Sequence, residues 1–146
     1  MLRRGAKVAN EMTIEFNDRT VDFDERYRII ESDVMQRIER RVIGSGFGAN
    51  SYTTMAQADE LAHRLHIEPE SLLLDIGSGA GWPGVHLAGT TGCRVVLTDM
   101  TIEGLRVAAD RLQREAVDGG AIGASGTDLP IRNETFDAAT CSDVFC

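Results

Sequence analysis

The sequence predicts an α/β fold built on a doubly wound, mainly parallel sheet. Two apolar runs, 72–74 and 95–97, each lead into an acidic residue, and a helical pattern follows each of them. A glycine-rich stretch, 77–84, connects the first run to its helix. Because buried-type strands that alternate with helices are typical of parallel sheets, we expect this architecture, preceded by additional helices.

Composition and charge limit the class of protein. The chain has 146 residues, 42% of them hydrophobic and 26% charged, which is typical of one ordinary globular domain. Its formal net charge of −8 disfavours broad nucleic-acid binding. No apolar run approaches the roughly 20 residues that span a bilayer, and the basic N-terminus lacks the apolar core of a signal peptide. Cys93, Cys141 and Cys146 form no C-x-x-C pair, so we expect reduced thiols, a cytoplasmic location and no zinc site.

The pattern divides the chain into three parts. Residues 1–20 show no periodicity and are expected to form a mobile arm. Residues 21–70 form a helical cap, and residues 71–146 form the core that carries the glycine stretch. In the cap, Asp22 and Glu25 resemble a helix start, and one helix is predicted from the apolar spacing of Tyr27, Ile30, Val34, Ile38 and Val42.

A second helix of the cap follows the loop 44–50. Thr54 and Gln57 form a capping-box pattern, and the helix is then marked by Met55, Ala58, Leu61, Ala62 and Leu65. The sequence 68–70 ends it before the first strand. We expect both helices to cover one side or the mouth of a ligand site.

The core is predicted as strand, glycine turn and helix, followed by three further strands. Pro83 suits the first turn of a short helix that ends near Gly89 or Gly92. Residues 94–99 form the second strand. Thr101 is expected to cap a helix that is stopped by 118–120 and whose apolar face is Ile102, Leu105, Ala109, Leu112 and Ala116. A weak third strand is expected at 121–124 and a fourth at 136–141.

Two interpretations of the glycine turn follow from the residues themselves. Residues 79–84 satisfy the dinucleotide fingerprint G-x-G-x-x-G, and Asp99 lies about 20 residues further on, as that motif expects. However, the glycines alternate from Gly77, and Asp75 directly precedes them. An acid there would repel a pyrophosphate and attract a ligand ammonium group, which disfavours a nicotinamide-dependent oxidoreductase.

The motifs resemble those of the class I S-adenosylmethionine-dependent methyltransferases from about residue 44 onward. The segment 75–81 is similar to the first motif of that family, an acid followed by alternating glycines. Asp99 matches the acid that closes the family's second strand. The segments 125–131 and 136–139 resemble the region of its third and fourth strands, and 44–54 resembles the approach to the first motif in small-molecule members.

The resemblance implies a cofactor site and roles for its residues. Asp99 would hold the ribose, Met100 would pack on adenine, and Asp75 would organise the ammonium group directly or through water. Ser125 stands where the family usually has an aspartate that meets adenine, which implies weaker recognition. The residues expected at the S-adenosylmethionine site are Asp75, Gly77, Ser78, Gly79, Gly81, Asp99, Met100, Ser125, Gly126 and Cys141.

Other side chains give weaker signals. Trp82 would either wall the cofactor site or pack the helix start, and Tyr52 would either close over the cofactor or anchor a loop. His63 and His66 lack a third ligand, so no metal site is predicted, and no catalytic base is evident.

The resemblance implies a Rossmann-like sheet of seven strands, of which this sequence supplies four. We therefore expect either a truncated domain or a homo-oligomer or partner chain that covers the open sheet. The predicted function is methyl transfer from S-adenosylmethionine to a small-molecule acceptor. An inactive cofactor-binding or assembly module remains open as an alternative, as does the less favoured oxidoreductase.

Overall fold

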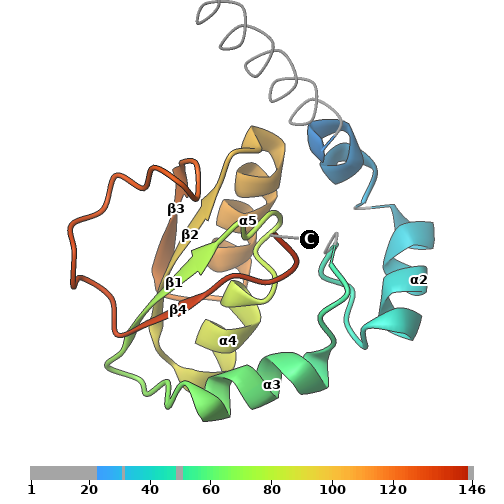
Figure 1. Ribbon diagram of the computed structural model, residues 1–146. Coiled ribbons are helices and arrows are strands. Elements are labelled where there is room, and N and C mark those ends of the chain that lie inside the picture. Colours follow the sequence, from blue (N-terminus) through green and yellow to red (C-terminus); the bar gives the residue numbers. More distant parts are fainter. Residues whose placement is uncertain (1–22, 31, 49–50, 145–146) are drawn as a thin grey trace, which may run out of the picture.

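The computed structural model describes residues 23–30, 32–48 and 51–144 (Figure 1). Residues 23–29 are helical. The elements that follow are α2 (Asp33–Val42), α3 (Met55–Arg64), β1 (Leu72–Ile76), α4 (Gly84–Thr91), β2 (Arg94–Asp99), α5 (Ile102–Arg114), β3 (Gly119–Gly123) and β4 (Ala138–Thr140). In this part of the chain no helix is long and apolar enough to span a bilayer.

The four strands form one parallel sheet in the order β3-β2-β1-β4. Leu73 of β1 lies between Val95 of β2 and Ala138 of β4. The order reverses at β1, which makes the space beyond β1 and β4 the topological switch point where such sheets bind ligands. The predicted parallel α/β sheet is confirmed.

Helices α4 and α5 cover one face of the sheet, and α3 packs on α4 (Figure 1). The side chains of Leu73, Val95 and Leu97 point to this face and are fully buried. They pack with Val85 and Leu87 of α4 in the main core cluster. Burial of large aliphatic side chains contributes about 1.5–3 kcal/mol each, so this layer fixes the ends of β1 and β2 that carry the site.

Several predicted elements are confirmed. The Thr54–Gln57 capping box is present at the start of α3, with Gln57 N–H donating to Thr54 Oγ1 at 3.3 Å. Strand β2 has the predicted bounds. Helix α4 ends at Gly92, which adopts a left-handed conformation with φ 78°.

The single helix predicted across the cap is wrong. The first helix ends at residue 29, and a new one begins at Ser32, whose side chain accepts the Met35 N–H. Helix α2 lies away from the sheet (Figure 1), and Val34, Ile38 and Val42 are 56%, 52% and 64% exposed. The predicted cap at Asp22 and the arm 1–20 lie outside the described residues.

The region around α5 also differs from the prediction. Helix α5 ends at Arg114, and Gly119 and Gly120 do not stop it but begin β3. A Cβ at Gly119 would lie 2.5 Å from the Val95 carbonyl oxygen, so the glycine permits close approach of β2 and β3. Ala108 is buried in place of the predicted Ala109, and Ile102 is 58% exposed. Strand β4 is limited to 138–140.

Candidate functional site

A cavity of about 320 Å³ lies where β1, β2 and β3 end, the size of a small ligand site. Its lining consists of Phe23, Tyr27, Ile76, Gly77, Asp99, Met100, Thr101, Ala124, Gly126, Asp143 and Val144. Four residues predicted for the cofactor site, Gly77, Asp99, Met100 and Gly126, are therefore brought together. They lie at the end of, or just after, three different strands.

The glycine turn presents its backbone to the cavity at Gly77. Gly77 has φ +69°, and its N–H donates to the Thr98 carbonyl at 2.7 Å. A Cβ there would collide with Val144, so glycine is required by conformation and by space. Gly81 has a different task, since a Cβ on it would lie 2.7 Å from Val85 and 3.3 Å from Ala108. It permits the turn to pack on α5 and does not line the cavity.

Asp99 is held rigidly at the edge of the cavity. Its Oδ2 accepts the Gly79 N–H at 2.8 Å, and its Oδ1 accepts the N–H and hydroxyl of Thr101 at 2.8 and 2.6 Å. A carboxylate has about four acceptor positions, and these bonds occupy three. The carboxylate thus keeps capacity for a ligand hydroxyl group while its direction is fixed.

Asp75 does not line the cavity. It is 1% exposed, and its carboxyl accepts the Gly84 N–H at 3.0 Å and the Thr140 hydroxyl at 2.8 Å. Burial raises the pKa of Asp75 to about 7, against the lowering effect of these two bonds. Asp75 therefore joins β1, β4 and the start of α4 beneath the turn, and it acts on the site through the backbone.

Asp143 follows β4 and joins the cavity to the loop before α3. Its Oδ2 accepts the Ser51 hydroxyl, the Tyr52 N–H at 3.0 Å and the Thr53 hydroxyl at 3.0 Å. The Ser51 bond is the main cause that lowers the pKa of Asp143, so the group stays ionised. The Thr53 carbonyl also accepts the Trp82 indole N–H at 2.9 Å. These bonds tie Asp143, which lines the cavity, to the loop before α3 and to the start of α4.

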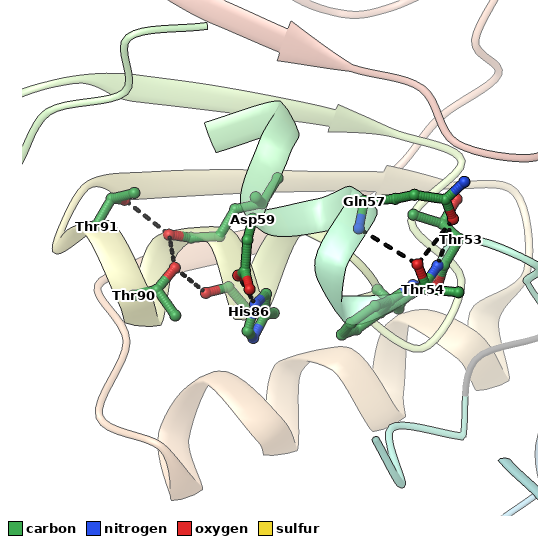
Figure 2. A network of polar contacts seen from close by, with 9 residues as sticks. Thr53, Thr54, Gln57, Asp59, His86, Thr90 and Thr91 are labelled. Carbon is green, nitrogen blue, oxygen red and sulfur yellow. Dashed lines mark hydrogen bonds and ion pairs between the residues drawn. The ribbon is translucent and has the colours of Figure 1, made fainter. Parts of the chain in front are cut away.

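The loop continues into a polar network between α3 and α4 (Figure 2). Beyond the capping box, His86 Nε2 lies 2.8 Å from Asp59 Oδ1. Trp82 is 3% exposed and packs on Phe47 with ring centroids 4.8 Å apart. Trp82 thus packs the start of α4, which was one of its two predicted roles.

The remaining predicted residues lie outside the cavity lining. Ser78 is buried beneath the turn, and the Ser125 hydroxyl lies 2.9 Å from that of Thr127. Cys141 is an exposed free thiol whose pKa is raised by desolvation and by Asp75, which disfavours a thiolate. Tyr52 is 85% exposed. Within the described ranges, no group of three or more His, Cys, Asp or Glu side chains forms a metal site.

Sequence reasoning expected the helical cap to cover one side or the mouth of the site, but it did not identify which residues of the cap and of the segment after β4 line the cavity. Phe23, Tyr27, Asp143 and Val144 all line the cavity. Tyr27 is 7% exposed, and its burial, followed by the charge of Asp99, raises its pKa. The helical spacing of Tyr27 indicated only that it is buried. Asp143 carried one usable signal, its place directly after a strand.

The sequence and the fold were compared with known proteins. Residues 74–146, half of the chain, match the family described as methyltransferase domain. A curated relative, sterol methyltransferase-like 3 of Botryococcus braunii, is 31% identical over 90 residues. That match covers 59% of this chain and 22% of the relative, so the chain spans about a fifth of the relative's length.

Two solved structures share the fold. A methyltransferase from Geobacter sulfurreducens, in complex with S-adenosyl-L-homocysteine, superposes with a TM-score of 0.58 at 21% identity, over 66% of this chain and 39% of that one. A methyltransferase from Thiobacillus denitrificans, with the same ligand, gives 0.54 at 23% identity, over 60% and 36%. With half of its length matched to the family and its cavity built largely from that half, this chain belongs to the methyltransferase domain family.

Proposed function

We propose that this chain binds S-adenosylmethionine in the cavity and transfers its methyl group to a small-molecule acceptor. The observation that carries the proposal is the convergence of Gly77, Asp99, Met100 and Gly126, all from the family-matched segment, on one cavity. Two further findings support it: the two structural neighbours hold S-adenosyl-L-homocysteine, and the curated relative is a methyltransferase-like protein.

The residues present fit this cofactor. Asp99 offers a fixed carboxylate acceptor for a ribose hydroxyl, and Met100 offers an apolar surface for a base. The Asp143 carboxylate, held ionised, adds a second negative charge to the lining, which favours a ligand that carries ammonium and sulfonium groups. When bound, the cofactor supplies an electrophilic methyl group.

The roles of the chain are to orient the ligand and to exclude water from the cavity. Gly77 lets Val144 pack on the turn at the edge of the cavity, and Asp75 holds the end of the turn in place from below. Phe23, Tyr27 and Val144 close the sides. Alignment of donor and acceptor supplies most of the rate in such a displacement. Ser125 and Cys141 do not line the cavity, and they stay predicted ligand contacts. Segment 124–128 would have to move to bring Ser125 to the ligand, and segment 141–144 to bring Cys141.

We also propose that a second copy or another chain covers the open side of the sheet. Strand β4 pairs with β1 along one edge, and among the described strands none pairs with its other edge. Unpaired edges are prone to further association. Mass measurement in solution tests this: a dimer or larger assembly supports the proposal. A strict monomer without turnover favours the alternative, an inactive cofactor-binding module.

The free thiols Cys93 and Cys141 support a reducing, cytoplasmic location.

Calorimetric titration of the 146-residue chain with S-adenosylmethionine and, separately, with NAD tests the function. We expect binding of S-adenosylmethionine alone. Asp99→Asn should weaken it at least tenfold, because one of the oxygens that fix the site becomes an amide donor. Asp110→Asn removes the same negative charge at an exposed position. It is the control and should bind normally. Binding of NAD alone would overturn the proposal in favour of an oxidoreductase.

A further inference from the structure

Tyr27 occupies the surface of the glycine turn although it is distant in sequence. Gly79 has φ +49°, and a Cβ on it would collide with the phenol of Tyr27. The ring is buried and lines the cavity together with Phe23. The helical segment 23–29 is therefore one wall of the site, and its position decides whether the cavity is closed at the turn.

Asp24 docks this segment on α5. Its Oδ1 accepts the Glu103 N–H at 3.1 Å, a free donor of the first turn of α5. Thr101 is the N-cap residue of α5, but its side chain makes no capping bond, and its hydroxyl donates to Asp99. Asp24 thus supplies from another element the capping acceptor that Thr101 does not provide.

The same turn of α5 abuts the glycine turn. A Cβ at Gly104 would lie 3.1 Å from the Gly79 carbonyl carbon and oxygen. Because Glu103 and Gly104 are neighbours, a segment fixed at the Glu103 amide is held directly above Gly79. Tyr27 and Ile30 also pack on Ala80 and Val107. The Arg28–Glu103 ion pair, at 3.3 Å with an arginine 62% exposed, adds little.

We propose that Asp24 is a positioning residue for the cofactor site, holding Phe23 and Tyr27 against the glycine turn through its bond to the first turn of α5. The inference rests on the proposed function and deepens it, since it makes cofactor affinity depend on residues outside the family-matched segment 74–146. Without the bond, segment 23–29 leaves the turn more often, the cavity loses a wall, and the ligand dissociates faster.

The test compares the full chain with Asp24→Ala, Asp24→Asn and Glu25→Ala. Asn retains an acceptor oxygen and caps about as well as Asp, whereas Ala has none. Glu25, exposed on the same helical segment, is the matched control for loss of a negative charge. Three quantities are measured: the dissociation constant of S-adenosylmethionine, its off-rate, and the amide hydrogen exchange of residues 23–30 in the unliganded protein.

We expect Asp24→Ala to raise the dissociation constant and the off-rate about tenfold and to speed exchange over 23–30. Asp24→Asn and Glu25→Ala should remain within about threefold of the unaltered chain. Equal binding by Asp24→Ala and the unaltered chain would overturn this inference alone, as would weaker binding without faster exchange, or no rescue by Asn. Absence of binding by the unaltered chain would instead overturn the proposed function.

Discussion

At the scale of single residues, Asp75 is an acidic group almost wholly removed from water. Its carboxyl is buried between β1, β4 and α4, and burial raises its pKa from 3.8 to about 7. The folded protein therefore retains a proton between about pH 4 and 7 that the unfolded chain has released. Stability contributed by this group is present at low pH and is lost as pH rises toward 7.

This loss predicts the behaviour of Asp75→Asn. The amide oxygen keeps an acceptor for the Gly84 N–H. The amide N–H can donate to Thr140 Oγ1, in place of the bond that the Thr140 hydroxyl donates to the carboxyl. We expect the substitution to stabilise the protein above pH 7 by up to roughly 4 kcal/mol, with little effect near pH 4. Urea unfolding across this range measures it, with Asp110→Asn as control. Equal pH slopes in Asp75→Asn and the unaltered chain would contradict the assignment.

Two neighbouring glycines of β3 provide a second residue-scale prediction. A Cβ at Gly119 meets the Val95 carbonyl oxygen, whereas a Cβ at Gly120 meets nothing within 4 Å. We expect Gly119→Ala to lower the free energy of unfolding by about 1–3 kcal/mol, because β2 and β3 must separate. Gly120→Ala should be neutral or slightly stabilising. Equal effects in denaturant titrations would show that the strand spacing is not limited at Gly119.

At the scale of elements, the segment 23–30 and helix α2 differ in how far their apolar side chains are buried. Ile30 is 7% exposed and packs on Ala80, whereas Ile38 of α2 is 52% exposed. We expect Ile30→Ala to cost about 2–4 kcal/mol and Ile38→Ala less than about 0.5 kcal/mol. Thermal unfolding of the two variants measures the difference. A large loss from Ile38→Ala alone would mean that α2 packs with another part of the protein.

Local signals explain which elements could be predicted from the sequence. Strand β2 and the Thr54–Gln57 cap depend on neighbouring residues, so their prediction was accurate. Periodicity groups residues on one face but does not reveal what covers it, which is why Val34 and Ile38 were placed in a packed helix. Gly119 fits in β3 because it has no Cβ, which would meet the Val95 carbonyl oxygen across the sheet. No local sequence pattern carries that information.

At the scale of the whole molecule, the cavity lining comes from three regions of the chain: the helical segment 23–29, the ends of β1, β2 and β3 with the residues after them, and residues 143–144. The predictable part, Asp99 and Met100 with Gly77, lies just beyond strands whose ends the sequence marks with acids and glycines. The unpredicted part consists of Phe23, Tyr27 and Asp143. Tertiary contacts place these residues, such as the bond from the Glu103 N–H to Asp24 and the bond from the Tyr52 N–H to Asp143. Sequence reasoning therefore located the strand ends that carry the site and expected the cap to cover it, but it did not identify the residues of the cap and of 143–144 that line the cavity.

The central claim is that S-adenosylmethionine binds where these three regions meet. Amide-resolved NMR titration of the isotopically labelled chain with S-adenosylmethionine tests this most directly. The account predicts saturable shifts concentrated at Gly77, 99–101 and Gly126, with weaker ones at Tyr27 and Asp143. Shifts confined to other surfaces, or no shifts at millimolar cofactor, would contradict it.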